Sequence, residues 1–326
     1  MKLPALFLKL SIVVSILLTT HSCTKDEKTT IAVVPKGTSH VFWKSVHAGA
    51  KKAEQELGIE TIWQGPEKED DRQMQIQVVQ NFISRNVDAL VLAPLDEVAL
   101  IRPVEAAIKR NIPTVIIDSD LKTDNYVSFV ATDNFEGGKI AAKELARLLK
   151  GNGNILMMRY AEGSASTAKR EEGFLEGINE YAPDVTLLST DQYAGVTAES
   201  ALQTGQNLIN KYEELDGIFC PNESTTFGML RALQTAAKAG TIKFVGFDSS
   251  EPLVTALEKE EIHGLVVQNP FKMGYLGVKT AMKALKGKPV EKRIDTGAML
   301  VTKDNLDTPP VQQAISPELD KWLSAK

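Results

Sequence analysis

Four polar side chains follow apolar runs of the sequence closely, at positions where they could together form a hydrogen-bonding site. Carboxylates accept hydrogen bonds from hydroxyl groups and amides both donate and accept, so such a set suits a ligand rich in hydroxyls. Each of the four taken alone is better explained as a helix cap or a turn residue. A shared site requires their strands to end at the same edge of a sheet. The four residues are Asp118, Asn222, Asp248 and Gln268.

A second group of candidate binding residues lies in the loop after the first apolar run. Lys36, Ser39, His40, Phe42 and Trp43 combine hydrogen-bonding groups with flat rings, which suits a small polar ligand that has an apolar face. The loop has a single glycine, so it lacks the several glycines at fixed offsets of a nucleotide-binding loop. The alternative is that the two aromatic residues belong to the core at the start of an amphipathic helix.

Catalytic and metal-binding patterns are missing from the sequence. The four histidines, His21, His40, His47 and His263, are scattered. His40 and His47 could share one helix face, but the spacing suggests no third metal ligand. No nucleophile elbow or metal-ligand motif occurs. We therefore expect a protein that is not an enzyme and that has no metal and no cofactor. The competing hypothesis is a hydrolase or isomerase that uses acids such as Asp118 and Asp248.

The elements that would position these residues alternate regularly between strand and helix. Short strands without apolar alternation indicate parallel sheets covered by helices on both faces, and ligands bind at the carboxyl ends of such strands. After five strands the pattern restarts, which predicts two similar doubly wound α/β lobes rather than one large sheet. The expected strands are 31–34, 60–63, 89–92, 114–117 and 127–130, then 154–158, 185–189, 217–220, 242–246 and 264–267.

Three segments of the chain resemble the ribose-binding type of periplasmic sugar-binding proteins, the type I periplasmic binding proteins of ABC transporters. They are the unit 31–58, the segment 131–138 (ATDNFEGG), and the segment 166–174 (STAKREEGF). The resemblance implies that Asn134 and Arg170 join the four strand-end residues in a sugar site, with Tyr193 as the facing aromatic ring. For Arg170 the alternative is an ion pair on a charged helix surface.

The same resemblance implies a hinge in which the chain crosses three times between the lobes, near 132–134, 268–270 and 293–297. We accordingly expect an N-terminal lobe of 31–132 plus 269–293, a C-terminal lobe of 133–268 plus 294–313, and a C-terminal tail of 314–326.

Several departures from the ribose-binding pattern affect the expected ligand. The family's polar residues are replaced at Ser39, His40, Ala93 and Ser119, while Pro35-Lys36, 64–66 and 118–120 resemble the autoinducer-2 and rhamnose receptor branch. In that branch the lysine and the aspartate contact ligand. We therefore predict a mixed pocket for a modest-sized sugar or polyol, with Lys36 as an additional contact.

The N-terminus resembles a bacterial lipoprotein signal. Two lysines precede a short apolar run that ends before Cys23, so 1–22 is expected to be a signal peptide and 23–30 a tether to a lipid-modified Cys23. The other cysteine, Cys220, closes an apolar strand and is expected to be buried and inert. Removing 1–22 leaves 35 basic and 42 acidic residues, a net charge of 35 minus 42, or −7. This acidity argues against a nucleic-acid partner.

These observations together predict a receptor in the periplasm or cell envelope, anchored through Cys23, that captures a sugar or polyol in the cleft between its lobes. The expected partner is an ABC transporter permease that recognises the closed form. The alternative is a ligand sensor that presents the closed form to a membrane signalling partner. The resemblance implies a monomer.

Overall fold

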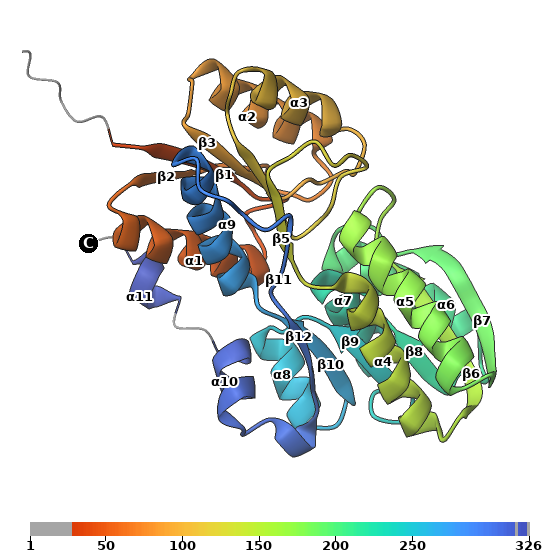
Figure 1. Cartoon of the computed structure of the whole chain (residues 1–326). Coiled ribbons are helices and arrows are strands. Elements are labelled where there is room, and N and C mark those ends of the chain that lie inside the picture. Colours follow the sequence, from red (N-terminus) through yellow and green to blue (C-terminus); the bar gives the residue numbers. More distant parts are fainter. Residues whose placement is uncertain (1–27, 317–318, 325–326) are drawn as a thin grey trace, which may run out of the picture.

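The computed structural model describes residues 28–316 and 319–324, and within them the chain forms two lobes, each built on a six-stranded sheet (Figure 1). The strand order of the first sheet is β11-β5-β4-β3-β1-β2, and neighbouring strands in it are parallel. This confirms the predicted pair of doubly wound lobes. The strands of the first sheet are β1 (Thr30–Val34), β2 (Glu60–Trp63), β3 (Ala89–Leu92), β4 (Thr114–Ile117), β5 (Ser128–Ala131) and β11 (Arg293–Asp295).

The second sheet repeats this plan in the order β12-β10-β9-β8-β6-β7, with β12 antiparallel to β10 at one edge. Strands β8, β9 and β10 are almost wholly apolar and buried, as a sheet covered on both faces requires. The strands are β6 (Asn152–Arg159), β7 (Asp184–Tyr193), β8 (Gly217–Phe219), β9 (Lys243–Phe247), β10 (Gly264–Gln268) and β12 (Ala298–Val301).

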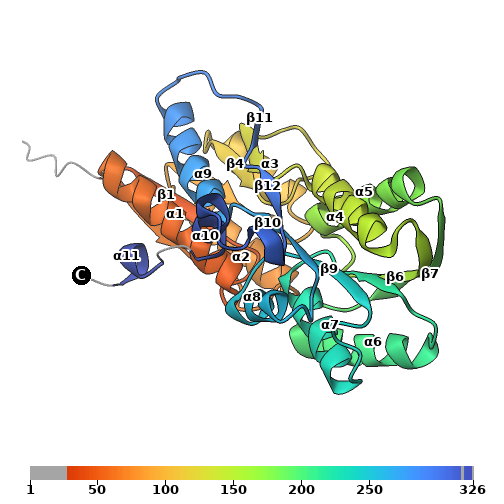
Figure 2. The ribbon, with the colours of Figure 1, turned by 90° about the horizontal axis from the view of Figure 1, so that it is seen from below.

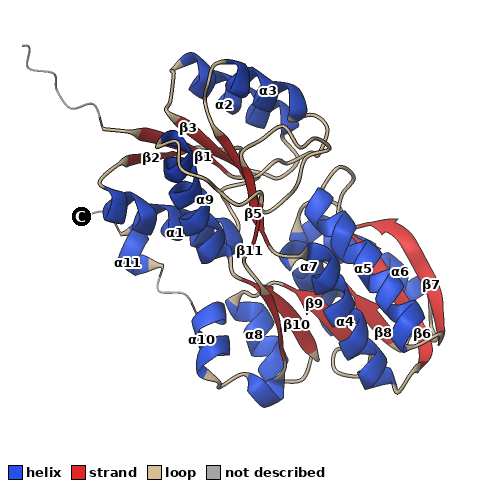
Figure 3. Ribbon diagram, viewed as in Figure 1, coloured by secondary structure: helices blue, strands red, loops and turns tan. Residues whose placement is uncertain are grey.

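Helices cover both faces of each sheet (Figure 3). In the first lobe, α1 and α9 pack together on one face and α2 and α3 on the other. In the second lobe, α4 and α5 cover one face and α6, α7 and α8 the other. The bounds are α1 (Val41–Leu57), α2 (Arg72–Ser84), α3 (Ile101–Lys109), α4 (Asn134–Leu149), α5 (Ala165–Tyr181), α6 (Ala198–Lys211), α7 (Glu223–Thr235), α8 (Glu251–Glu258) and α9 (Pro270–Leu285).

Two glycines, Gly138 at the end of the ATDNFEGG segment and Gly173 in α5, allow α4 and α5 to pack closely. A Cβ at Gly138 would overlap the carbonyl oxygen of Arg170, and one at Gly173 would overlap that of Phe135. The two helices therefore approach each other backbone to backbone, which only glycine permits. This contact holds the turn of α5 that carries Arg170 against α4.

The chain crosses between the lobes three times, after β5, after β10 and after β11 (Figure 1). The third crossing differs from the expected boundary between 293 and 294, which would cut β11. Arg293, Ile294 and Asp295 all pair with β5, so this strand lies wholly in the first sheet. The crossing is at 296–297, where Gly297 adopts a positive φ of 83°.

The C-terminal residues make specific contacts with both lobes. Helix α10 (Pro309–Ile315) packs on the second lobe through the buried Val311 and lies beside α8 (Figure 1). Helix α11 (Asp320–Leu323) packs against α1 of the first lobe (Figure 2). The Trp322 ring lies 6.2 Å from that of Phe271 at the start of α9. The expected signal peptide, the tether up to residue 27 and Cys23 lie outside the described residues. Within the described part, no helix is long and apolar enough to cross a membrane.

Candidate functional site

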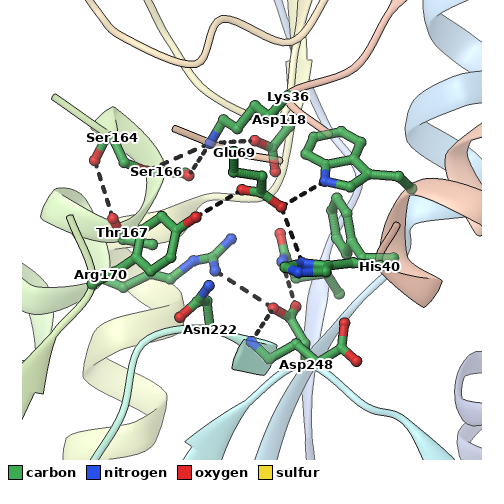
Figure 4. Close-up of a pocket in the computed structure, with 15 residues that line it drawn as sticks. Lys36, His40, Glu69, Asp118, Ser164, Ser166, Thr167, Arg170, Asn222 and Asp248 are labelled. Carbon is green, nitrogen blue, oxygen red and sulfur yellow. Dashed lines mark hydrogen bonds and ion pairs between the residues drawn. The ribbon is translucent and has the colours of Figure 1, made fainter. Parts of the chain in front are cut away.

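Nine of the predicted site residues meet in one cavity between the lobes, at the carboxyl ends of the strands of both sheets (Figure 4). The free space is small, about 30 Å³, room for only a few water molecules, because charged side chains from both lobes reach into it. The nine are Lys36, His40, Phe42, Trp43, Asp118, Arg170, Asn222, Asp248 and Gln268. The cavity is completed by Glu69, Tyr160, Ser164, Ser166, Thr167 and Glu223, which the sequence analysis did not identify.

Two aspartates occupy corresponding positions in the two lobes. Asp118 follows β4 and Asp248 follows β9, and both adopt the left-handed backbone conformation, with φ of 62° and 68°. Their backbone N–H groups donate to the neighbouring strand, at Val130 and Val266 respectively. Aspartate tolerates this conformation better than most residues. The sharp turn at each strand end places both carboxylates in the cavity.

Lys36, from the loop after β1, connects the first aspartate to the second lobe. Its Nζ lies 2.8 Å from Asp118 Oδ2 and donates to Ser166 Oγ at 3.1 Å and Ser164 Oγ at 3.5 Å. Both partners of the ion pair are about 5% exposed. The three hydrogens of the ammonium are thus directed to protein oxygens from both lobes.

Arg170, on the first turns of α5, is held on three sides. Its Nε donates to Asn134 Oδ1 at 2.8 Å and its Nη1 to the Pro221 carbonyl at 2.9 Å. The guanidinium lies 4.0 Å from the centre of the Phe247 ring, and Nη1 is 3.9 Å from Asp248 Oδ2. Burial lowers the pKa of Arg170, an effect that the nearby Asp248 opposes.

The predicted site residue Asn134 does not line the cavity. It is buried at the start of α4, where its side chain accepts from Arg170 and donates to the Asp118 carbonyl. Asn134 therefore contacts Arg170 on the side away from the cavity and fixes the orientation of its guanidinium group. Asn134 was expected to bind the ligand; it is not among the residues that line the cavity, and a direct role in binding stays a prediction.

The second aspartate is held by the end of β10 and the start of α7. Gln268 Nε2 donates to Asp248 Oδ1 at 2.6 Å, and the Glu223 backbone N–H donates to Oδ2 at 3.1 Å. Asn222 caps α7 by accepting from the Thr225 backbone N–H. Burial raises the pKa of Asp248. Two buried oxygens around this aspartate, Gln268 Oε1 and Glu223 Oε2, have no hydrogen-bond donor in the described structure.

Glu69, from the loop between β2 and α2, is the main site residue that the sequence analysis missed. Its carboxylate accepts from Trp43 Nε1 at 2.7 Å and from Tyr160 at 3.0 Å, and lies 3.1 Å from His40 Nδ1. Burial opposes its ionisation, but the hydrogen bonds and charge interactions with His40, Lys36 and Trp43 together outweigh it and lower the pKa of Glu69 to about 2. The same hydrogen bond raises the pKa of His40.

Two further predicted residues lie outside the cavity. Ser39 is exposed and donates to the Glu67 carbonyl, so it joins its own loop to the loop between β2 and α2. Tyr193, at the end of the edge strand β7, is 38% exposed, and its ring lies 4.9 Å from the Arg159 guanidinium. The tyrosine of the second lobe that lines the cavity is Tyr160, which follows β6 and is 2% exposed.

Both interpretations of the first-loop aromatic residues are partly correct. Trp43 is 2% exposed and packs in the core of the first lobe, yet it also lines the cavity and hydrogen-bonds Glu69. Phe42 meets it edge to face, with ring centres 4.9 Å apart. The two rings thus form an apolar wall supported by the core.

Direct hydrogen bonds join the lobes beside the cavity. The Ser166 backbone N–H donates to Ser119 Oγ at 3.0 Å, and that of Glu97 donates to the Gly163 carbonyl at 2.9 Å. Arg72 Nη2 donates to the Glu162 carbonyl at 3.1 Å. With the Lys36 and Glu69 contacts, these bonds describe a closed arrangement of the lobes.

Metal binding requires clustered ligand side chains, and thiol chemistry requires an accessible thiolate. Within residues 28–316 and 319–324, no group of three or more His, Cys, Asp and Glu residues could hold a metal ion. Cys220 is buried, and burial raises the pKa of its thiol well above the usual value, so the thiolate is disfavoured.

Comparison with known proteins matches residues 31–289 to the family model described as periplasmic binding protein domain. The ribose import binding protein RbsB of Escherichia coli is 29% identical over 284 residues, which cover 87% of this chain and 94% of that protein. A carbohydrate transporter solute-binding protein from Agrobacterium radiobacter, solved with D-arabinose, is 34% identical with a TM-score of 0.85, covering 88% of this chain and 99% of that one. An ABC transporter solute-binding protein from Agrobacterium vitis with bound D-fucose is 36% identical, with the same TM-score and coverage.

Proposed function

Because the chain belongs to the periplasmic binding protein domain family, we propose that it is a non-enzymatic receptor that captures a monosaccharide or similar small polyol between its lobes. The observation that carries this proposal is the pair of buried, donorless oxygens in the cavity, Gln268 Oε1 and Glu223 Oε2. An unpaired buried acceptor is costly, and ligand hydroxyl groups would satisfy it. The sugars named for the two Agrobacterium structures support the same ligand class.

The proposed binding mode uses polar groups and rings separately. Asp118 and Asp248 would accept from ligand hydroxyls, while Asn222, Gln268 and Arg170 would supply donors. The Phe42, Trp43 and Tyr160 rings would cover the C–H faces of the sugar. The small free volume in the closed arrangement means that a sugar would enter an open form and that some side chains would move to admit it.

Closure on the ligand would produce the form that a partner recognises. The partner that we propose is an ABC permease, in keeping with the names of the relatives. The second candidate function is a sensor of a sugar or of autoinducer-2. It is suggested by the loss of polar family residues and by the position of Lys36 beside Asp118. We also propose a monomer located in the periplasm, anchored through a lipid on Cys23. That residue lies outside the described structure.

Thermal denaturation against a ligand panel tests the proposed function. The panel contains pentoses, hexoses, deoxysugars, polyols and autoinducer-2. A ligand at about 100 times its Kd should stabilise the native state by about 2.7 kcal/mol, which raises the Tm by a few degrees for a protein of this size. Asp248→Asn should abolish the shift, whereas the exposed Asp184→Asn should retain it. A panel without any shift, or a shift that survives Asp248→Asn, would contradict the proposal.

A further inference from the structure

The basic side chains of the cavity are each engaged by an acidic one. Lys36 pairs with Asp118 at 2.8 Å. His40 lies 3.1 Å from Glu69 and Arg170 lies 3.9 Å from Asp248. These three are the only basic residues among those that line the cavity, which contains four acids. The unmatched acid is Glu223.

Glu223 has a fixed position on the first turn of α7. Its backbone N–H donates to Asp248 Oδ2 at 3.1 Å, and the Asn222 cap holds the start of the helix. The Ser250 side chain hydrogen-bonds its carboxyl group, but the buried Oε2 has no donor, and within the described residues no basic group lies within ion-pair distance. The carboxyl group is thus held in place and only half satisfied.

The surroundings of this carboxyl group disfavour its charged form in the protein alone. Burial raises the pKa of Glu223 to about 7, and the neighbouring Asp248 and Glu69 carboxylates add to the effect, against the attraction of His40. His40 is already hydrogen-bonded to Glu69 through Nδ1 and faces Glu223 from the other lobe. A cationic ligand group beside Oε2 would restore the charged form and pair with it.

We propose that Glu223 forms a subsite for a protonated amino group, so that this receptor prefers amino-substituted sugars to the parent sugars. This inference rests on the proposed function and names a ligand class for the same cavity. An anionic sugar would add negative charge where the acids already outnumber the bases and where no basic side chain is left unpaired. A neutral hydroxyl would satisfy Oε2 with one hydrogen bond, but unlike a protonated amine it would add no charge attraction to the Glu223 carboxylate.

Calorimetric titration with matched sugars tests the subsite. The probes are D-galactose and D-glucose, each compared with its 2-amino-2-deoxy and 6-amino-6-deoxy derivatives, so that a pair differs at one carbon atom. A hydrogen bond to a charged group contributes about 1.5–3 kcal/mol, which corresponds to a preference of roughly 10- to 100-fold. We expect at least one amino derivative to bind the wild-type protein that much more tightly than its parent.

Substitutions assign the preference to one residue. Glu223→Gln keeps the size of the side chain and removes its charge, and it should abolish the preference for the amine. The matched control is Glu199→Gln, an exposed acid on the first turn of α6 in the same lobe, which should keep it. If Glu223→Gln does not fold, Glu223→Asp, which withdraws the charge by one methylene, should reduce the preference instead.

The outcomes separate this inference from the proposed function. Neutral sugars that bind as tightly as, or more tightly than, all their amino derivatives would overturn the amine subsite and leave the sugar receptor intact. A preference that survives in Glu223→Gln would also overturn it. If none of these sugars binds the wild-type protein, the amine subsite fails, and the proposed function fails with it only when the thermal panel also gives no shift.

Discussion

Gly163 offers the sharpest test of the closed arrangement, because its substitution should impair closure without touching a residue that lines the cavity. It lies in the second lobe with φ of 86°, and its carbonyl accepts from the Glu97 backbone N–H of the first lobe at 2.9 Å. A Cβ at this position would overlap the Asp96 carboxylate. We therefore expect Gly163→Ala to hold the lobes apart on this side.

The obstructing carboxylate cannot move aside cheaply. Asp96 Oδ1 accepts from the backbone N–H groups of Val98 at 2.9 Å and Ala99 at 2.8 Å, and Oδ2 pairs with Arg72 Nε at 3.1 Å. The closed form would lose one interlobe backbone bond, about 0.5–1.5 kcal/mol, and some of these contacts as well. If the lost backbone bond and the disturbed Asp96 contacts together destabilise the closed form by about 1.4 kcal/mol, ligand affinity falls roughly 10-fold.

The Gly163→Ala substitution should also strain the backbone at residue 163, and this effect can be measured separately from closure. An L residue with positive φ costs about 1–2 kcal/mol, which lowers the Tm whether or not the lobes close. Gly151→Ala is the matched control, because Gly151 has φ of 81° in the same lobe and an added Cβ would meet nothing within 4 Å. Both variants should lose thermal stability, but only Gly163→Ala should lose affinity in calorimetry with the sugar that stabilises the wild type. Equal affinities of the two variants would refute the reasoning.

Three other predictions concern buried ionisable groups. The pKa of Glu69 is lowered from 4.5 to about 2, so its contribution to the free energy of unfolding is present above pH 4.5 and is lost as pH falls toward 2. Wild type should therefore lose more Tm than Glu69→Gln between pH 5 and pH 3; parallel curves would contradict this. Arg170→Ala leaves Asp248 buried without its arginine and should lower the free energy of unfolding by about 3–5 kcal/mol in urea denaturation, whereas a loss below 1 kcal/mol would show that the contact is unimportant. Cys220, buried with a raised thiol pKa, should react with iodoacetamide only after unfolding, as peptide mass spectrometry would detect; rapid labelling of the native protein would refute its burial.

Much of the fold could be predicted because it depends on local sequence patterns. The runs 60–63, 89–92 and 114–117 are strands with the predicted bounds. The last two are short segments buried on both faces, as a covered parallel sheet requires. The positions of Asp118 and Asp248 followed from the same argument, because residues after parallel strands share one edge of the sheet.

The errors in the predicted site arise where geometry is not local. Tyr193 was expected in the cavity, but β7 shifts register twice along β6, and Tyr193 ends beside Arg159 on the edge strand. A shift of one residue turns a side chain to the opposite face of the sheet. Tyr160 takes the place at the cavity. It directly follows β6, so the strand-end argument that placed the two aspartates could have identified it.

The sequence by itself determined the two lobes and most of the residues that meet at the strand ends, because alternation and strand-end position are properties of neighbouring residues. The tertiary structure alone decided the roles of Glu69 and Glu223. In the sequence, Glu69 stands in an acidic run that is typical of a solvated loop, and Glu223 is an ordinary acid at a helix start. In the folded protein both carboxyl groups are largely removed from water. Glu69 finds a basic partner in His40 and Glu223 finds none among the described residues, and this difference depends on contacts between residues far apart in the sequence.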